Sequence, residues 1–323
     1  MKYKLVLLSV LLLLLSCSEE EDTPDYNLDF KQEMRDFVIG ISQYAKAENA
    51  NFVVIPQNGQ ELVTLNGEEE GSPATAYLTA VDGVGREDLF YGYDDDNIAT
   101  PSSEKNYMIA FLDICENNSV EVLTTDYCWT ESKMDDSYAQ NALKGYVSFA
   151  APDRELNVIP DYPLQPININ SSNITSLAET KNFLYLLNPE AFATKQAFIN
   201  ALSATNYDVI IIDCFFNDDL LTFNDVAQLK IKQNGGSRLV ISYMSIGEAE
   251  DYRYYWQVAW NTSKPEWIEA ENPDWEGNYK VKYWEQEWQS IIYGNSNAYL
   301  DKILDSGFDG IYLDIIDAFE YFE

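Results

Sequence analysis

Short apolar runs rich in β-branched residues recur along this chain, and helix-like stretches separate them. Several runs are continuous rather than alternating, as in Val209–Ile212, and this pattern is typical of strands buried on both faces of a parallel sheet. The pattern predicts eight strands, at Phe52–Pro56, Val81–Arg86, Val120–Thr125, Gly145–Ala150, Phe183–Leu187, Asp208–Asp213, Leu239–Ser245 and Gly310–Asp314.

Helical periodicity between these strands is clearest in three segments. Asp29–Asn49 and Glu190–Ser203 carry apolar residues at helical spacing. The third segment, Ser296–Asp305, precedes Gly307, and a glycine at this place is a stop signal for a helix. Alternating strands and helices in residues 29–323 predict an α/β protein, a single (β/α)8 TIM barrel. An open doubly wound sheet is the alternative, which the lack of a glycine-rich phosphate loop after any strand disfavours.

Two segments interrupt the alternation. Residues 151–180 contain four prolines and a polar stretch, and we interpret them as a long surface connection. Residues 246–295 exceed an ordinary strand-to-helix connection and are expected at the carboxyl ends of the strands. Indole rings there could stack on the apolar faces of sugars or form the insertion's own small core. This insertion holds six of the seven tryptophans: Trp256, Trp260, Trp267, Trp275, Trp284 and Trp288.

The N-terminus has the pattern of an export signal. Lys2 and Lys4 precede an apolar run that is too short to span a bilayer, so residues 1–16 are predicted to be a removable signal peptide. The run ends at Cys17 and resembles the lipobox of bacterial lipoproteins, in which this cysteine is lipidated. Residues 17–28 are acidic and are expected to form a flexible tether. The protein is therefore expected to be exported to the outer membrane and cell surface, touching the membrane through its lipid alone; an ordinary secretory signal is the alternative.

Composition limits the possible chemistry. The chain has no histidine, which excludes Ser-His-Asp and Cys-His machinery and disfavours a zinc site of the usual kind. A net charge of −34 excludes a nucleic-acid binder, because phosphate needs a basic surface. Besides Cys17, an odd number of cysteines remains, which argues against a disulfide framework. We expect a monomer without cofactor or metal, although a calcium or magnesium site among the acids is a weaker alternative.

Acidic and amide side chains stand at the ends of nearly all the predicted strands. In a barrel these ends meet at one rim, where neighbouring acids raise some pKa values and let one carboxyl act as an acid while another stays ionised. Paired acids and abundant aromatic residues without histidine are the outline of a glycosidase. Solvated loop acids in a very acidic protein are the alternative. The residues concerned are Gln57, Asn58, Glu87, Asp88, Asp126, Asp213, Glu248, Glu250, Asp251, Asp314 and Asp317.

Longer motifs resemble the endo-alpha-1,4-polygalactosaminidase family and its barrel relatives, glycoside hydrolase family 114. The motifs include Asp208–Asp213, the Tyr-x-Ser-x-Gly-Glu block within Leu239–Glu250, Asn272–Trp275 and the Gly-Phe-Asp-Gly-x-Tyr-x-Asp block at Gly307–Asp314. In the N-terminal half, Met34–Phe37, Pro56–Gly59 and Asp82–Glu87 also match the family's pattern.

The order of these motifs differs from that in the usual family member. There the Met-x-x-Phe helix and the Pro-Gln-Asn-Gly strand follow the Tyr-Leu-Asp strand, whereas here they precede it. The resemblance therefore implies a circularly permuted barrel, with residues 151–180 linking the family's ordinary C- and N-termini. A closed barrel with neighbouring termini tolerates such a rearrangement.

The resemblance also implies a function. It indicates a retaining, endo-acting hydrolase of an alpha-1,4-linked, galactosamine-rich polysaccharide, with Asp314 and Glu87 as nucleophile and general acid in that order. Asp317 is an alternative to Asp314, and Glu248 an alternative to either. The expected sugar-binding residues are Asn58, Tyr185, Asp213, Tyr243, Glu248, Glu250, Trp284 and Asp317. A second hypothesis is a carbohydrate-binding lipoprotein that keeps the barrel without catalysis.

Overall fold

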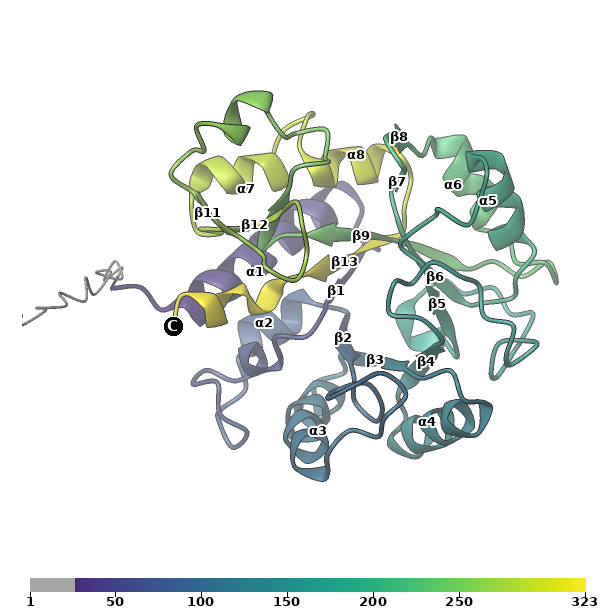
Figure 1. Cartoon of the computed structure of the whole chain (residues 1–323). Coiled ribbons are helices and arrows are strands. Elements are labelled where there is room, and N and C mark those ends of the chain that lie inside the picture. The colour runs from purple at the N-terminus through teal and green to yellow at the C-terminus, as the bar shows by residue number, and fades with distance from the viewer. Residues whose placement is uncertain (1–26) are drawn as a thin grey trace, which may run out of the picture.

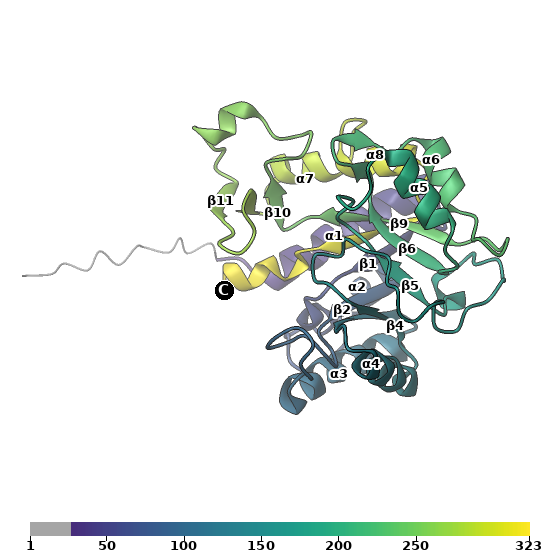
Figure 2. The same ribbon diagram turned by 45° about the vertical axis from the view of Figure 1, so that its right-hand side comes forward.

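The computed structural model describes residues 27–323, so the predicted signal peptide, Cys17 and most of the predicted tether lie outside the described residues. None of the helices in residues 27–323 combines the length and apolar character that crossing a bilayer requires. The strands lie in the middle of the molecule and the helices surround them (Figures 1 and 2).

Eight parallel strands form two sheets in this α/β protein. The larger sheet has the order β1 (Val53–Pro56), β13 (Gly310–Asp314), β9 (Leu239–Ser245), β6 (Val209–Asp213), β5 (Phe183–Tyr185). The smaller has the order β2 (Gly83–Glu87), β3 (Glu121–Tyr127), β4 (Val147–Ala151). All eight predicted strands are confirmed to within two residues at either end.

The two sheets meet at two seams. At the first, a parallel bridge joins Gln57 to Gly85, and the Asn58 N–H donates to the Gly85 carbonyl at 2.8 Å. At the second, β4 contacts β5 without a ladder, and the rings of Phe149 and Phe183 fill the seam at 5.8 Å. The strand order is that of an eight-stranded ring, but the continuous hydrogen-bonded barrel that we expected is absent from the described residues.

The connection after β4 explains the open seam. The N–H groups of Leu187 and Asn188, which follow β5, donate to the carbonyl of Leu156 at 2.8 and 3.2 Å. These two N–H groups could otherwise continue β5 and pair with β4, but a residue of the segment 151–180 binds them instead. As predicted, this segment is an irregular connection, with a single short 3-10 helix, η2 (Leu177–Glu179), among its residues.

Eight α-helices in residues 27–323 surround the strands. The first begins where Asp29 accepts a hydrogen bond from the Gln32 N–H at 2.9 Å, as an N-cap should. The second predicted helix starts later than Glu190, because Thr194 caps it, and the third starts at Tyr299 rather than Ser296. The bounds are α1 (Phe30–Glu48), α2 (Thr75–Ala80), α3 (Ser102–Asn117), α4 (Glu131–Lys144), α5 (Lys195–Ser203), α6 (Phe223–Leu229), α7 (Gln286–Ile292) and α8 (Tyr299–Asp305).

Short elements complete the described fold. They are η1 (Gln60–Val63), β7 (Phe215–Phe216), β8 (Asp219–Leu220), β10 (Glu248–Glu250), η3 (Val258–Asn261), β11 (Ile268–Glu271), β12 (Asn278–Val281) and η4 (Ile316–Tyr321). In the predicted insertion, β10, β12 and β11 form an antiparallel sheet. Four of its indoles pack in series, Trp256 on Trp260, Trp260 on Trp267 and Trp267 on Trp288, with ring centroids 5.2–5.3 Å apart. These four rings form the insertion's own core, which was one of the two expected outcomes.

The first and last of the eight strands are neighbours. Residues Val53 to Pro56 of β1 pair in register with Gly310 to Leu313 of β13, and α1 packs against η4. Lys31 and Glu323 form an ion pair that joins the two ends of the described chain. This proximity is what a circular permutation requires, although the permutation itself stays a prediction.

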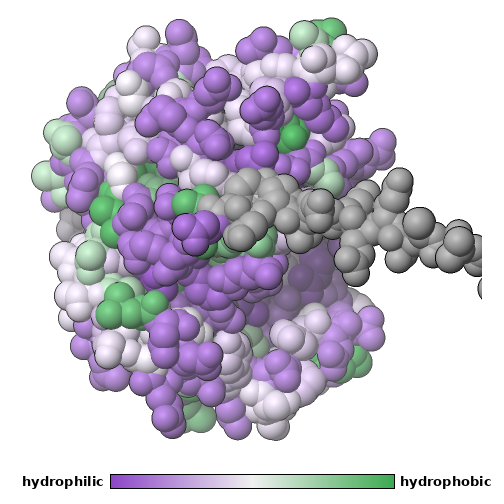
Figure 3. All heavy atoms as spheres, turned by 90° about the vertical axis from the view of Figure 1, so that its left-hand side faces the viewer, coloured by the Kyte–Doolittle hydropathy of each residue, from purple (hydrophilic) through white to green (hydrophobic). Residues whose placement is uncertain are grey.

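The outer surface agrees with the acidic composition. The face in Figure 3 is mostly hydrophilic, with scattered hydrophobic side chains and no broad apolar area among the described residues in view. The apolar residues of the strands are instead internal, and Val209, Ile210, Ile211 and Ile212 of β6 are each 0% exposed. The continuous apolar run in the sequence is thus explained by burial on both faces.

Candidate active site

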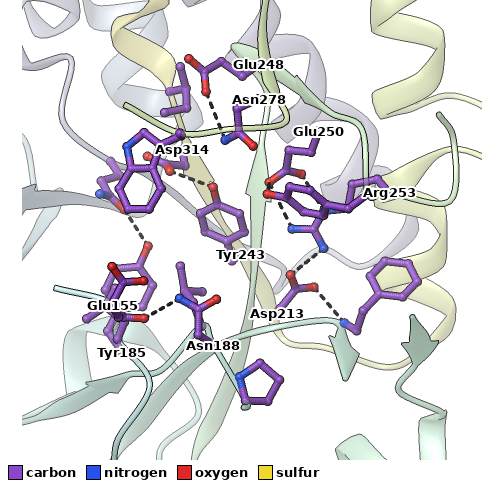
Figure 4. A pocket seen from close by; sticks show the side chains of 18 of the residues that line it. Glu155, Tyr185, Asn188, Asp213, Tyr243, Glu248, Glu250, Arg253, Asn278 and Asp314 are labelled. Carbon is purple, nitrogen blue, oxygen red and sulfur yellow. Dashed lines mark hydrogen bonds and ion pairs between the residues drawn. The ribbon is translucent and has the colours of Figure 1, made fainter. Parts of the chain in front are cut away.

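A pocket of about 880 Å³ lies at the carboxyl ends of the parallel strands. Figure 4 shows side chains from several strands pointing into it. The site is therefore assembled from the strands of both sheets, at the strand ends where barrel enzymes carry their active sites. Each strand contributes a residue within three positions of its carboxyl end: Gln57, Glu87, Tyr127, Arg154, Tyr185, Asp213, Tyr243 and Asp314.

The pocket is strongly acidic. Ten carboxyl groups line it against two guanidinium groups, those of Arg154 and Arg253. The negative charge of this pocket lining attracts a cationic group and repels an anion. The acids are Glu87, Glu155, Glu190, Asp213, Asp218, Glu248, Glu250, Glu276, Asp314 and Asp317.

Glu87, at the end of β2, is held by two donors. The Asn58 amide donates to Oε2 at 3.0 Å, and the Tyr127 hydroxyl donates to Oε1. The Asn58 side chain also accepts from the Glu87 N–H at 3.2 Å. Hydrogen bonds to both carboxylate oxygens fix the position of the group.

Asp314, at the end of β13, has a different environment. The Tyr243 hydroxyl donates to its Oδ2 at 2.9 Å (Figure 4). Burial, and then the nearby charges of Glu87 and Asp317, raise the pKa of Asp314 to about 8, and the Tyr243 hydrogen bond opposes this rise. The pKa of Asp317 is also raised by burial, with the Arg86 guanidinium opposing it.

Glu87 and Asp314 therefore form an electrostatically coupled pair in one pocket. After burial, the charge of Glu87 is the largest cause of the raised pKa of Asp314. In the unliganded pocket, a pKa of about 8 favours the protonated form of Asp314 at neutral pH. The order of roles expected from the motifs places the proton on Glu87 instead, so catalysis in that order requires the proton to move.

An arginine supports Glu87 through Tyr127. The guanidinium carbon of Arg154 lies 3.9 Å from the centre of the Tyr127 ring, which is a cation–π contact. Arg154 also binds Asp88 at 2.8 Å and Asp96 at 2.7 Å. Burial raises the pKa of Asp88 to about 6, and the Arg154 hydrogen bond opposes this rise.

A second arginine neutralises two of the expected sugar-binding acids. Arg253 binds Asp213 Oδ2 at 2.6 Å and Glu250 Oε2 at 2.6 Å, as Figure 4 shows. The Tyr252 hydroxyl donates to the other Glu250 oxygen at 2.8 Å. Both acids line the pocket, but their charges are balanced by Arg253, which is 8% exposed as a side chain.

The carboxylate of Glu248 is paired with a lysine and two asparagines. The carboxylate is 0% exposed and binds Lys280 at 2.7 Å, Asn272 at 2.8 Å and Asn278 at 3.3 Å. Such a group is a structural anchor rather than a free acid. Tyr185, another expected binding residue, donates its hydroxyl hydrogen bond to Gln57 at 3.0 Å.

The structure thus brings most of the sequence-predicted site residues into one pocket, but Asp88, Asp126, Asp251 and Trp284 lie outside its lining. Trp284 lies outside the pocket lining and packs on Phe30 and Phe322, with ring centroids 5.1 and 4.7 Å away. Asp126 lies inside β3 rather than after it, and its buried carboxylate binds Ser137 and the N–H of Phe90. The sequence pattern could not exclude Trp284 or Asp126, because side-chain packing in the folded chain decides where these two residues lie.

Sequence reasoning did not single out Tyr127, Arg154, Arg253 and Trp275 as site residues. One available signal was the position of the arginines: Arg154 follows a predicted strand end, and Arg253 follows the Tyr-x-Ser-x-Gly-Glu block. A buried acidic rim needs counter-charge, so arginines next to it are candidates for the site.

The described residues contain no group of three or more Asp, Glu, His or Cys side chains placed to hold a metal ion. Cys115, Cys128 and Cys214 are buried free thiols, and burial raises the pKa of Cys115 and Cys128 to about 12. The side chains that line the pocket include carboxyl, phenol, amide, guanidinium and indole groups.

Comparison with known proteins gives a partial match. An uncharacterized protein of Methanocaldococcus jannaschii is 40% identical over 153 residues, which cover 47% of this chain and 42% of the relative. Uncharacterized proteins of Thermotoga maritima and Deinococcus radiodurans are 42% and 39% identical over 120 and 125 residues, which cover 37% and 39% of this chain. These two matches cover 36% and 38% of the relatives, so the chain spans less than half the length of all three.

A family model matches the C-terminal half. The match runs from residue 170 to residue 323, which includes Tyr185, Asp213, Tyr243 and Asp314 of the pocket, whereas Glu87 and Arg154 lie before it. The family is one of glycosidases. Residues 170–323 match the model of glycoside-hydrolase family GH114.

Proposed function

We propose that this protein is a retaining, endo-acting glycoside hydrolase that cleaves an alpha-1,4-linked polysaccharide rich in galactosamine. The observation that carries the proposal is the pair Glu87 and Asp314, which come from distant parts of the chain and share one pocket with coupled charges. Two carboxyl groups on either side of a glycosidic bond supply both the proton and the nucleophile that its hydrolysis needs.

In the proposed reaction Asp314 is the nucleophile and Glu87 the acid and base. An Asp314 oxygen attacks the anomeric carbon while the Glu87 proton passes to the leaving oxygen, so the glycosidic bond breaks as a glycosyl ester forms. Glu87 then takes a proton from water, whose oxygen attacks the anomeric carbon and releases Asp314. Glu87 gives up its proton in the first step and regains one from water in the second, so the full cycle restores the pair to its starting state.

An amino-sugar substrate would place the shared proton where this reaction needs it. In the empty pocket the raised pKa of Asp314 favours its protonated form at neutral pH. The ammonium group of galactosamine is next to the anomeric carbon, so it would lie close to Asp314 and stabilise its carboxylate. A positive charge within a few ångströms lowers the pKa of a carboxyl group, and the proton would then pass to Glu87.

The pocket's charge and size support this substrate class. Ten acids against two arginines suit a partly deacetylated, cationic polymer. A volume of about 880 Å³ is at the upper end of the range of roughly 300–1,000 Å³ for ligand pockets. Space for more than one sugar unit agrees with cleavage within a chain.

The test begins with purified protein that lacks residues 1–28, incubated with partly deacetylated and fully acetylated amino-sugar polymers. We expect reducing ends to appear from the deacetylated polymer, and the first product should keep the anomeric configuration of the bond cleaved when followed by NMR. Glu87→Gln and Asp314→Asn should each abolish turnover while the folded circular dichroism spectrum is retained.

Azide then separates the two roles. With an activated substrate, Glu87→Ala should be rescued to a glycosyl azide of retained configuration, and Asp314→Ala to one of inverted configuration. The reverse pattern would exchange the roles. Full activity of Glu87→Gln would refute the catalytic pair, and binding without cleavage by the unaltered protein would favour the non-catalytic alternative.

We also propose that the two sheets act as one permuted (β/α)8 barrel and that the protein is a lipoprotein at the outer membrane and cell surface. The neighbouring positions of β1 and β13 support the first proposal. The second rests on the sequence around Cys17. A surface anchor would place a glycosidase next to polymers outside the cell.

A further inference from the structure

The tryptophans of the described residues differ sharply in exposure. Trp260, Trp267 and Trp288 are buried, and Trp256 and Trp284 are partly buried against the core. Trp129 and Trp275 are 55% and 49% exposed. A half-exposed indole presents an aromatic face on which the apolar face of a ligand can stack.

Trp275 is the tryptophan that lines the large pocket. It stands on the turn between β11 and β12, and its carbonyl accepts from the Asn278 N–H at 3.1 Å. Glu276 and Asn278, beside it on the same turn, also line the pocket. An aromatic face, a carboxylate and an amide are thus presented together.

The turn is held rigidly in this position. The Asn272 N–H donates to the Asn278 carbonyl at 2.7 Å, which closes the turn around Trp275. Gly277 has a φ of +87°, and a Cβ at this position would lie 2.7 Å from Asp251 Oδ1. The chain reverses here because glycine permits both the left-handed backbone and the close contact.

Glu248 ties the turn to the rest of the fold. Its buried carboxylate binds Asn272 on one side of the turn and Asn278 on the other, at 2.8 and 3.3 Å. Lys280 balances its charge at 2.7 Å. Because Glu248 follows directly on β9, the turn that carries Trp275 is fixed relative to Tyr243 and the strand ends.

We propose that Trp275 is a platform on which one sugar ring of the substrate stacks, and that Glu248 is the positioning residue that holds this platform. The apolar face of the ring lies on the indole, and an ammonium group at its edge faces Glu276. The assignment of the ring as an amino sugar rests on the proposed function, whereas the stacking of a sugar does not. Cation–π attraction adds to the stacking when the sugar is protonated.

The test compares Trp275→Ala and Trp275→Phe with Trp129→Ala, a matched control that removes an equally exposed indole outside this pocket. With a galactosamine oligomer as substrate, Trp275→Ala should raise KM by about 10-fold or more, which corresponds to about 1.4 kcal/mol, and by more than it lowers kcat. Trp275→Phe should recover part of the loss, and Trp129→Ala should change KM less than about 2-fold, a difference under about 0.5 kcal/mol.

Binding is measured separately in a Glu87→Gln background, by calorimetric titration with the same oligomer. The Kd should rise with Trp275→Ala in step with KM. Glu248→Gln should raise KM and Kd by part of that amount. In the double variant, Glu248→Gln should raise Kd little beyond the effect of Trp275→Ala alone, because the effects of two substitutions that act through one contact are not additive.

The outcomes separate this inference from the proposed function. If the unaltered protein cleaves the oligomer and Trp275→Ala leaves KM unchanged, the platform is refuted and the hydrolase stands. If nothing is cleaved but the oligomer binds in a Trp275-dependent way, the platform stands and the hydrolase is refuted. If Trp275→Ala and Trp129→Ala raise KM equally, the platform is refuted. If the effects of Trp275→Ala and Glu248→Gln on Kd are additive, the positioning role of Glu248 is refuted.

Discussion

The hydroxyl of Tyr243 donates a hydrogen bond to Asp314 at 2.9 Å across the β9–β13 ladder. Tyr243 pairs in register with Tyr312, so its side chain reaches the carboxyl group two residues further along β13. This bond stabilises the charged form of Asp314 against the effect of burial. The opposing effects of burial and of this hydrogen bond contribute to the pKa of Asp314.

Replacing Tyr243 should therefore shift the pH dependence of the reaction. In the unaltered protein the singly protonated pair is lost as the pH rises through the Asp314 pKa of about 8, so kcat/KM should fall above that pH. Tyr243→Phe removes a factor that lowers this pKa, so the alkaline limb should move to higher pH while the maximal rate drops about 10- to 100-fold. An alkaline limb that moves to lower pH would contradict the assignment.

Stability should depend on the same group. The pKa of Asp314 is raised from 3.8 to about 8 in the folded protein, so its contribution to stability is complete below pH 3.8 and is lost as the pH rises through about 8. Asp314→Asn, which stays neutral, should match the unaltered protein near pH 4 and exceed it above pH 8 by at least about 2 kcal/mol. Urea unfolding at both pH values checks this, with Asp219→Asn, an exposed acid, as the control.

Arg253 should be essential to the stability of the pocket wall. Arg253→Met leaves Asp213 and Glu250 without their partner, and unpaired buried charges cost about 3–5 kcal/mol. Arg253→Lys should recover part of this loss, because it restores the charge without the forked geometry. Chemical denaturation measures both variants, and a loss below about 1 kcal/mol in Arg253→Met would show that the acids relax or take up protons.

The proposed permutation can be reversed. A chain that starts near Asn170, runs to Glu323, continues through a short linker into Asn27 and ends near Asp161 should fold, because β1 and β13 are already paired. Its midpoint of thermal unfolding should lie within about 8 °C of that of the unaltered protein, which corresponds to a few kcal/mol at this size. Failure to fold, while a second permuted chain opened at another surface loop folds, would argue that residues 151–180 are not a junction.

Export should depend on Cys17. When the full chain is produced in a Gram-negative host with labelled palmitate, the label should enter the protein and the protein should sediment with membranes. Cys17→Ala should abolish labelling and release the protein from the membrane fraction. Labelling that persists in Cys17→Ala would disprove the lipobox.

Much of the strand pattern could be read from local sequence. The run Val209–Ile212 is a buried strand because its residues are β-branched and apolar on both faces, and neither property depends on the neighbours it acquires. The placing of Asp314 at a strand end follows in the same way, since its carboxyl group ends the apolar run Ile311–Leu313 where burial stops.

Tertiary structure decided what each of these side chains does. Glu248, Asp213 and Glu250 look alike in sequence, yet one pins a turn through two asparagines and the other two share Arg253. The difference between Trp284, packed on Phe30 and Phe322, and Trp275, open to the pocket, is likewise set by which elements meet.

The sequence by itself determined the strands, the helices and the acidic, histidine-free chemistry, because these follow from the local pattern and composition. The folded structure alone decided which carboxyl groups are neutralised, which tryptophan stays exposed and where the shared proton lies. These properties depend on distance and burial, and residues far apart in the chain, such as Glu87 and Asp314, come under each other's influence when the strands assemble.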